Sequence, residues 1–293
     1  MKEIYGSGVA LVTPFNNDFT IDFDSLEKLI NHVINGGINY LVILGTTGES
    51  VTLTKKEKHK IIAFCKKINN NRIPIVVGIG GSSTSQVIHD IECTNLIGVD
   101  AILSVSPAYN KPTQKGIYHH YKSIATSTDL PIILYNVPSR TSSNIEAETT
   151  LRLAHDFSNI VAIKEASGNL DQIHKIIKNK ASKFSVLSGD DALTLPMINL
   201  GATGVISVIG QSFPKEFSKM VNLALEGFQS KANKIHLDLY DFYNPLYCEG
   251  NPVGIKACLE LQELCSSTVR LPLIRASKPV SYTHLRAHET YDH

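Results

Sequence analysis

Residues 160–164 read Ile-Val-Ala-Ile-Lys, an apolar run that ends in a single charged residue. A parallel strand covered on both faces is apolar throughout, whereas a strand with one solvated face alternates between apolar and polar residues. Seven other short, mostly apolar runs cover residues 9–15, 40–44, 73–79, 101–105, 132–135, 184–188 and 204–209. The sequence therefore predicts eight buried parallel strands.

Segments with helical periodicity separate these runs. Residues 54–68 begin with Thr-x-x-Glu, from Thr54 to Glu57, which is the pattern of an N-terminal capping box. The other segments cover residues 22–35, 83–97, 115–127, 146–155, 170–178, 192–200 and 214–226. Strict alternation of eight strand–helix units predicts an α/β protein with a (β/α)8 TIM barrel, in preference to an open doubly wound sheet.

The helical pattern continues after the last predicted strand. Residues 231–247 and 252–265 have helical periodicity with no strand between them. We therefore expect a catalytic barrel over residues 1–227 and a C-terminal helical appendage over residues 228–278. The last stretch, residues 279–293 (PVSYTHLRAHETYDH), has neither helical nor strand periodicity, and we interpret it as a non-native tail outside the fold.

Composition excludes several classes of partner. The chain has 293 residues, 43% of them hydrophobic, and a formal net charge of +1, so neither nucleic acid nor a membrane surface is an expected partner. No apolar run reaches the roughly 18 residues of a membrane span, and the N-terminus has no sustained apolar segment, so we expect a cytoplasmic protein.

Cysteine and histidine patterns point to neither a disulfide framework nor a metal site. The five cysteines are scattered, without a Cys-x-x-Cys pair. The eleven histidines show no metal-ligand spacing. His119 and His120 are adjacent, and we expect them to be an exposed polar pair on a helix.

In a barrel of this kind, reactive groups lie where strands end and the following loops begin. Lys164 occupies such a position. Burial penalises the ammonium form of a lysine, so a lysine at a buried strand end is a candidate for a neutral amine that forms a Schiff base with a ketone. The alternative is a lysine whose side chain merely extends from the strand end into solvent.

Three other strand ends carry candidate groups. Tyr135 ends the strand next to that of Lys164, about 4.8 Å away, where a phenol could move protons during imine formation; it could equally fill the barrel and bond to the backbone. The loop over residues 45–50 (GTTGES) could hold a small carboxylate with N–H groups and hydroxyls, or be an ordinary turn. Arg140 could clamp a second carboxylate, or be a solvated loop residue.

Five motifs occur in a characteristic order and spacing: GTTGES from residue 45, SPAYNKP from 106, YNVPSRT from 135, VAIKEASG from 161 and SGDDA from 188. Together they resemble the dihydrodipicolinate synthase family, within the superfamily of pyruvate-dependent class I aldolases that includes N-acetylneuraminate lyase. The resemblance spans residues 5–277. The paired threonines and Arg140 favour the synthase branch over the sialic-acid lyase branch.

The resemblance implies an activity and a set of residue roles. The enzyme would condense pyruvate with L-aspartate 4-semialdehyde through a lysine Schiff base, the first committed step of the diaminopimelate route to lysine, without metal or cofactor. The implied catalytic residues are Lys164, Tyr135, Thr46 and, reaching in from a neighbouring subunit of a dimer or a dimer of dimers, Tyr109. The implied substrate-binding residues are Thr47 for the pyruvate carboxylate, Arg140 for the aldehyde's carboxylate, and Gly189 and Ile206 as pocket lining.

The resemblance also bears on regulation. Members inhibited by lysine bind it at a dimer interface with His, His, Asn, Glu and Tyr. The matching positions here are Lys55, Lys58, Ser82, Gln86 and Ala108. Two added positive charges and the loss of a carboxylate disfavour a cationic amino acid, so we predict weak or absent inhibition by lysine.

Two alternative functions remain open at this point. One is a different pyruvate aldolase that acts on a 2-keto acid such as a sialic acid or 2-keto-3-deoxygluconate, for which a polyhydroxy aldehyde would need hydroxyl partners in place of Arg140. The other is a non-catalytic barrel that binds a metabolite and signals through its interface.

Overall fold

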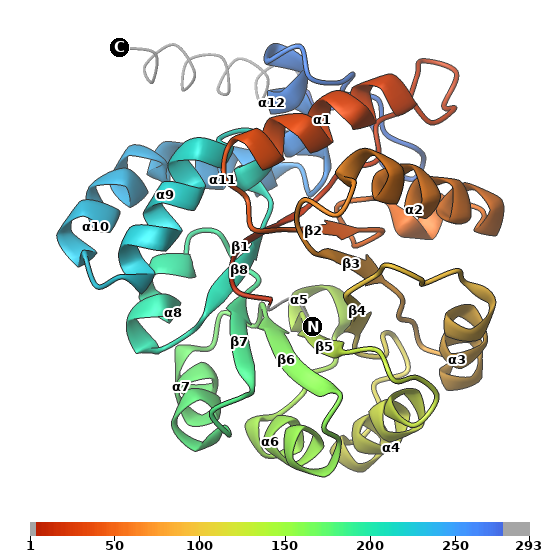
Figure 1. Cartoon of the computed structure of the whole chain (residues 1–293), viewed down its shortest axis with the longest axis vertical. Coiled ribbons are helices and arrows are strands. Elements are labelled where there is room, and N and C mark those ends of the chain that lie inside the picture. Colours follow the sequence, from red (N-terminus) through yellow and green to blue (C-terminus); the bar gives the residue numbers. More distant parts are fainter. Residues whose placement is uncertain (1–3, 278–293) are drawn as a thin grey trace.

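A closed barrel of eight parallel strands forms the centre of the computed structural model, which describes residues 4–277 (Figure 1). The strands are β1 (Gly6–Ala10), β2 (Tyr40–Ile43), β3 (Ile75–Gly78), β4 (Ala101–Val105), β5 (Ile132–Asn136), β6 (Ile160–Glu165), β7 (Ser185–Ser188) and β8 (Gly204–Ser207). Each strand pairs in parallel with the next, and β8 pairs with β1 to close the ring. The predicted barrel is confirmed.

Helices surround the barrel and connect its strands. The main ones are α1 (Phe23–Asn35), α2 (Lys55–Asn69), α3 (Thr84–Cys93), α4 (Gln114–Ala125), α6 (Ala147–Asp156), α7 (Leu170–Asn179), α8 (Thr194–Leu200) and α9 (Pro214–Leu225). Three short helices lie in loops: η1 (Ser50–Thr52), α5 (Pro138–Thr141) and η2 (Ile209–Gln211). The capping box of α2 is present as predicted, with Thr54 accepting from the Glu57 N–H and the Glu57 carboxylate accepting from the Thr54 N–H.

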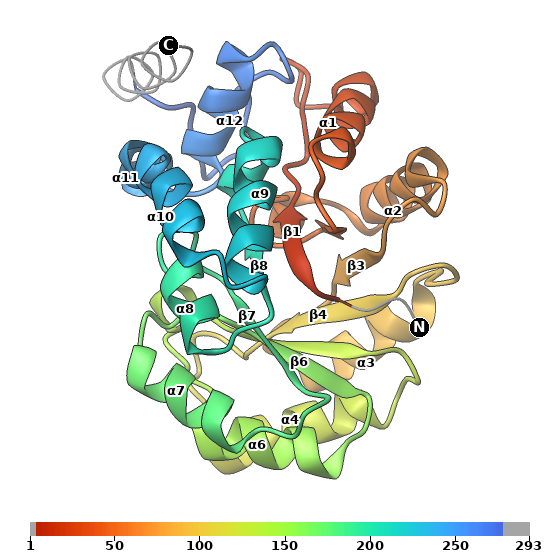
Figure 2. The same cartoon turned by 60° about the vertical axis from the view of Figure 1, so that its left-hand side comes forward.

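Three further helices follow the barrel: α10 (Gln229–Asp238), α11 (Tyr240–Cys248) and α12 (Val253–Leu261). They lie together beside α9 (Figure 2). The prediction of one helix over residues 231–247 was wrong, because the chain breaks at Leu239, whose N–H caps the end of α10. The periodicity did not reveal this break because Leu239 is itself apolar and buried, so the helical pattern continues through it.

The first strand differs from its prediction, which placed it at residues 9–15. β1 begins at Gly6 and ends at Ala10. Glycines replace apolar residues at its start because the barrel floor is filled from elsewhere: a Cβ on Gly8 would lie 2.1 Å from the Tyr40 ring. The Tyr40 hydroxyl in turn donates to the carbonyl of Val205 across the barrel.

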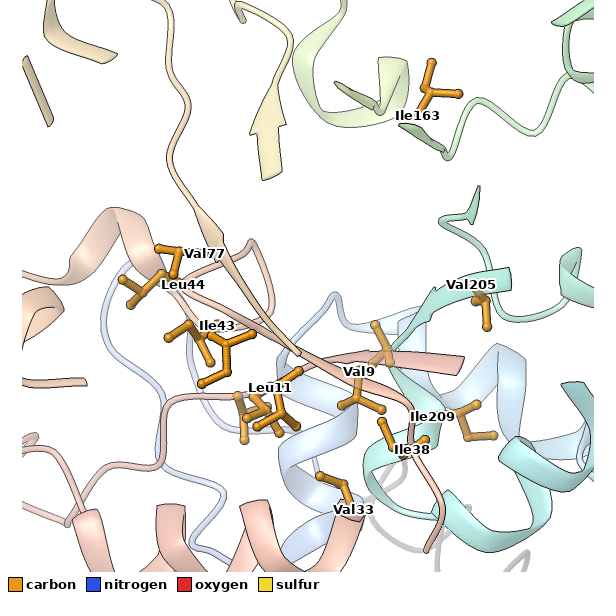
Figure 3. Close-up of a cluster of buried hydrophobic side chains, with 14 of the residues drawn as sticks. Val9, Leu11, Val33, Ile38, Ile43, Leu44, Val77, Ile163, Val205 and Ile209 are labelled. Carbon is orange, nitrogen blue, oxygen red and sulfur yellow. The ribbon is translucent and has the colours of Figure 1, made fainter. Parts of the chain in front are cut away.

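The core has two layers, and alternate residues of each strand contribute to one or the other. The outer layer lies between strands and helices; Figure 3 shows part of it, including Val9 of β1, Val33 of α1 and Ile209 of η2. The inner layer fills the barrel, and it includes Ala162 and Tyr135. This alternation decides which side chains can reach the mouth of the barrel.

Two further predictions concern the tail and a membrane span. The interpretation of residues 279–293 as a tail lies outside the described residues. Within residues 4–277, no helix is long and apolar enough to cross a membrane.

Candidate active site

Lys164 and Tyr135 face each other inside the barrel. They are directly paired in the register of β5 and β6. Both belong to the inner-facing residues of their strands, and each is 6% exposed. The Lys164 Nζ lies 4.3 Å from the centroid of the Tyr135 ring. The sequence-based pairing of amine and phenol is therefore present, and Lys164 does not extend into solvent.

Both side chains line a cavity of about 630 Å³ at the mouth of the barrel. The other lining residues are Thr47, Val137, Ser139, Arg140, Ala166, Gly189, Asp190, Ala192, Val208, Tyr240, Tyr243, Asn244, Tyr247 and Asn251. Five of these come from α11 and the turn after it, so the C-terminal helices form one wall of the cavity. No site residue was predicted in that region from the sequence.

Thr47 reaches this cavity from the loop after β2. Its side chain is 2% exposed, and its Oγ1 accepts a hydrogen bond of 2.9 Å from the side-chain amide of Asn251. Because the oxygen is already an acceptor for Asn251, the hydroxyl hydrogen of Thr47 is free to donate to a ligand. A donor in this position, on the same cavity as Lys164, suits a carboxylate.

Thr46 faces a different space. It lines a second cavity, of about 430 Å³, together with Tyr135, Val105 and Ala108. Tyr135 therefore borders both cavities, with Lys164 on one side and Thr46 on the other. This placement suits a phenol that passes protons between the amine and the second cavity.

Arg140 lies in α5, which is held by a backbone bond from Arg140 N–H to Val137 and has proline at its first position. Its side chain is exposed at the rim of the larger cavity. Among residues 4–277 no ion pair involves its guanidinium. The cation is thus available to an anionic ligand that enters the cavity.

Gly189 and Ile206 were both expected to line the pocket, but only Gly189 lines the larger cavity. A Cβ on Gly189 would lie 3.0 Å from Lys164 Cε and 2.6 Å from Ala166 Cβ, so glycine leaves the room that the lysine occupies. Ile206 is 1% exposed and packs in the inner layer of the barrel. It is not among the residues that line the larger cavity, where Val208 of the same chain segment takes that place.

Tyr109 is not brought to Lys164 within one chain. Its side chain is 91% exposed, and its backbone has a φ of 70°, held by a hydrogen bond from its N–H to Thr141. The neighbouring Ala108 lines the smaller cavity. An aromatic side chain presented to solvent next to that cavity is available to a second copy of the chain.

Beneath the reactive lysine lies a buried polar network that the sequence analysis missed. Glu165, the next residue, points the other way, between the strands and helices. Its carboxylate accepts from the side chains of Asn136 and Gln172 and from the N–H of Ser167. A charged residue directly after a buried lysine was the available signal, and its partners fix the strand end that carries Lys164.

A second missed group is Asp191, although the SGDDA motif contains it. It is 2% exposed, and burial raises its pKa. Its carboxylate accepts from the N–H groups of Val208 and Ile209 and from the hydroxyl of Tyr247. The bond to Tyr247 attaches α11 to the barrel at the cavity wall.

The expectation that His119 and His120 are both exposed was wrong for His120. His119 is exposed as expected, but His120 is only 5% exposed. It faces the neighbouring helix α3, where its Nδ1 lies 2.9 Å from the hydroxyl of Thr84. Adjacent residues on a helix point about 100° apart, so one of a pair can be buried while the other is solvated.

The chain is similar to known proteins over nearly its whole length. A family model described as the dihydrodipicolinate synthetase family matches residues 3–287. The 4-hydroxy-tetrahydrodipicolinate synthase of Parabacteroides distasonis is 50% identical over 281 residues, covering 96% of this chain and 94% of the relative. That of Flavobacterium psychrophilum is 48% identical over 281 residues, 96% of each chain.

Solved structures also match over nearly the whole chain, at lower sequence identity. The dihydrodipicolinate synthase from Aquifex aeolicus superposes with a TM-score of 0.95 at 41% identity, covering 99% of this chain and 98% of that one. A structure described as a monomeric dihydrodipicolinate synthase variant has a TM-score of 0.96 at 37% identity, covering 98% and 97%.

Proposed function

The chain belongs to the dihydrodipicolinate synthetase family, and from that premise we propose that it condenses pyruvate with L-aspartate 4-semialdehyde, as its relatives' name, 4-hydroxy-tetrahydrodipicolinate synthase, describes. It is an enzyme of the lyase class that acts through a lysine Schiff base. The observation that carries the proposal is the buried amine of Lys164, 4.3 Å from the ring of Tyr135 on a cavity large enough for both substrates.

Lys164 supplies the nucleophile. Its free amine attacks the ketone carbon of pyruvate, and loss of water gives an imine. The protonated imine withdraws electrons, so the methyl group loses a proton and becomes an enamine carbon. That carbon forms a bond to the aldehyde carbon of the semialdehyde. The amino group of the semialdehyde then replaces Lys164 at the former ketone carbon, which releases the lysine and closes the ring.

Tyr135 and Thr46 move protons in these steps. Imine formation requires a proton for the departing water, and methyl deprotonation requires a base. Tyr135 borders both the cavity of Lys164 and that of Thr46, which supports a role for its phenol in exchanging protons with each. In this proposal Tyr109 of a second copy extends the relay from Thr46 toward solvent.

Thr47 and Arg140 bind the two carboxylates. Thr47 donates to the carboxylate of pyruvate, with its oxygen held by Asn251. Arg140 at the cavity rim binds the carboxylate of the incoming semialdehyde, for which a planar guanidinium is suited. Gly189 leaves room for the lysine. Ile206 contributes from the barrel interior, beneath the lining.

Two measurements test this function. Borohydride reduces an imine, so treatment with pyruvate and borohydride adds mass to Lys164, and Lys164→Ala removes the adduct. No adduct on the wild-type chain would support the non-catalytic binding barrel instead. Initial rates with aspartate semialdehyde are then compared with rates with N-acetylmannosamine. Preference for the amino sugar would assign the chain to the sialic-acid branch.

We also propose a homo-oligomer, a dimer or a dimer of dimers, because the side chain of Tyr109 is exposed and lines neither cavity within one chain. The relatives vary in this respect, since one solved structure is described as a monomeric variant. Size-exclusion chromatography with light scattering measures the state; a monomer with full activity would remove the need for a second copy.

Weak or absent inhibition by lysine remains part of the proposal. Four of the five residues at the positions that match the inhibitor site line the smaller cavity: Lys55, Lys58, Ser82 and Ala108. Lys55 is paired with Asp90 at 3.2 Å, which offsets part of its charge, while Lys58 forms no ion pair among the described residues. Initial rates with millimolar lysine test this, and strong inhibition contradicts it.

We propose a cytoplasmic location because the cysteines form no disulfide among the described residues. All five lie within the described residues, and all are free. Free thiols persist in reducing compartments, whereas secreted proteins commonly form disulfides. Cell fractionation with an antibody to the chain would locate it.

A further inference from the structure

The C-terminal helix α12 holds the loop that carries Thr46 and Thr47 through a buried ion pair. Lys256 of α12 lies 2.6 Å from Glu49, with Nζ donating to Oε1. The lysine side chain is 0% exposed and the glutamate side chain 1% exposed. Such a pair is costly to bury and is therefore found where its groups are closely held by further contacts.

Both charged groups have additional partners. The second oxygen of Glu49, Oε2, accepts from the N–H of Arg270 at 2.9 Å. Lys256 Nζ also donates to the carbonyl of Thr268 at 2.8 Å and lies 4.2 Å from the ring centroid of Phe15. The carboxylate is thus fixed from two directions, by α12 and by the chain segment that follows it.

The loop that is held in this way has an unfavourable backbone. Leu44, before GTTGES, has a φ of 58°, and Glu49, within it, has a φ of 51°. Non-glycine residues rarely adopt this region, and such conformations persist only where the surroundings determine them. Glu49 is two residues from Thr47, so a change in its conformation moves the threonine.

A second contact connects the same C-terminal segment to the loop. Asn251, just before α12, donates to Thr47 Oγ1. The segment from Asn251 to Lys256 therefore contacts the loop at two points. One is Thr47, the residue proposed to bind pyruvate, and the other is Glu49.

We propose that Lys256 and Glu49 are positioning residues for pyruvate binding, which act by holding the loop so that Thr47 faces the cavity. This inference rests on the proposed function, since it assumes that Thr47 binds the carboxylate of pyruvate. Neither residue lines the larger cavity, so neither touches the reacting atoms.

The test measures pyruvate binding in Glu49→Gln and Lys256→Met. Glu49→Gln keeps the shape of the side chain and its ability to accept from Lys256 Nζ, and it removes only the charge. In both variants we expect the KM for pyruvate to rise about tenfold or more, with a smaller fall in kcat, because Lys164 and Tyr135 are not disturbed. The pyruvate concentration for half-maximal borohydride trapping should rise in parallel.

Two further variants separate positioning from stability. Glu49→Gln combined with Lys256→Met removes the ion pair without leaving an unpaired buried charge, so its KM for pyruvate should stay raised if the pair positions the loop. A wild-type KM in this double variant would overturn the positioning role. Ile173→Ala is the control, because Ile173 is buried in α7, on the opposite side of the ring of helices from α12 (Figure 1). At an assay temperature below the melting temperatures of the wild type and of Ile173→Ala, this control should keep the wild-type KM for pyruvate.

The outcomes distinguish the inference from the function it rests on. If the wild-type chain forms no adduct with pyruvate and borohydride, the proposed function fails. If it forms the adduct and Glu49→Gln and Lys256→Met both keep the wild-type KM and half-trapping concentration, the proposed function stands and the positioning role is overturned. An equal rise of KM in Ile173→Ala would also overturn it, since lowered stability alone would then explain the effect.

Discussion

At the scale of single residues, orientation along a strand decides which groups can react. Lys164 and Glu165 are adjacent, yet Lys164 enters the barrel and Glu165 enters the layer beneath the helices. Successive side chains of a strand point to opposite faces, so the chain separates the amine from a carboxylate that would otherwise favour its protonated form. The free space around the amine depends in turn on the absence of a side chain at Gly189.

Gly189→Ala is expected to impair catalysis through this lack of space. The new Cβ would lie 3.0 Å from Lys164 Cε and 2.6 Å from Ala166 Cβ, so the lysine must shift. We expect kcat to fall at least about tenfold, since misplacement of a reacting group by 1 Å can cost about a hundredfold. Steady-state rates and the rate of borohydride trapping measure the effect.

Gly116→Ala is the matched control for this substitution. Its Cβ would lie 3.2 Å from Pro112 Cβ, and neither Gly116 nor Pro112 lines either cavity. It should keep the wild-type kcat. Wild-type trapping by Gly189→Ala would contradict the steric explanation.

His120 makes the stability of the fold depend on pH. Burial lowers the pKa of His120 to about 4, against an ordinary value of 6.5. Between these values the unfolded chain binds a proton that the folded chain does not, so stability is fully present above about pH 6.5 and is lost as pH falls toward 4. Burial also lowers the pKa of His32 and His236, which adds to the same trend.

Thermal unfolding between pH 7 and pH 5 measures this dependence. His120→Gln should flatten it, because an amide does not titrate and can still bond to Thr84. His119→Gln, one position along the same helix and exposed, should keep the wild-type slope. The assignment to His120 is wrong if both variants lose stability with falling pH as steeply as the wild type.

At the scale of elements, local sequence decides where helices begin more reliably than where they end. The capping box of α2 was predicted from Thr54 and Glu57 alone and is present. The break between α10 and α11 was not, because it depends on how each helix packs against α9 and the cavity wall. A capping hydrogen bond joins residues three positions apart, so it can be predicted from the sequence nearby. The packing of a helix face depends on an element that is distant in the sequence.

Thr54→Ala should reduce stability by about 1 kcal/mol, the usual cost of losing an N-cap hydroxyl. In a chain of this size that corresponds to about 2 °C in Tm. The reason is the loss of the acceptor for the Glu57 N–H. Calorimetry or circular dichroism measures the change, and Thr54→Ser, which keeps the hydroxyl, should stay close to the wild-type Tm. A Tm for Thr54→Ala equal to that of Thr54→Ser would contradict the capping role.

At the scale of the whole molecule, the proposed catalytic set is incomplete in one copy of the chain. Lys164, Tyr135 and Thr46 lie around two adjoining cavities, while Tyr109 is exposed beside the smaller one. A second copy that supplies Tyr109 would connect catalysis to assembly, and activity would then fall on dilution.

Mixing two impaired variants tests this connection. Lys164→Ala lacks the nucleophile, and Tyr109→Phe lacks the phenol of the proposed relay. If Tyr109 acts across the interface, a mixed oligomer contains a site with Lys164 from one copy and Tyr109 from the other, so activity partly returns. Mixtures that have only the summed activities of the two variants, despite exchange of subunits shown by native mass spectrometry, would place Tyr109 outside the relay.

The barrel, the strand ends and most of the proposed site could be predicted from the chain alone. Apolar runs such as residues 160–164 indicate strands that are buried on both faces, and the periodic segments between such runs indicate helices with one buried face. Both patterns can be seen in a short stretch of sequence. Lys164, Tyr135, Arg140 and the loop over residues 45–50 could be proposed because parallel strands of a barrel end at one face, so position along the chain translates into position in space. The separate roles of Thr46 and Thr47 within that loop came from the family resemblance.

The wall of the cavity and the support of its loop required the folded molecule. Asn251 is 204 residues from Thr47, and Lys256 is 207 residues from Glu49. No periodicity relates such pairs, and each residue alone resembles an ordinary polar side chain of a helical region. Their contact follows from the packing of α12 against the mouth of the barrel. A buried charge is stable there only because the fold brings its counter-charge within hydrogen-bond distance.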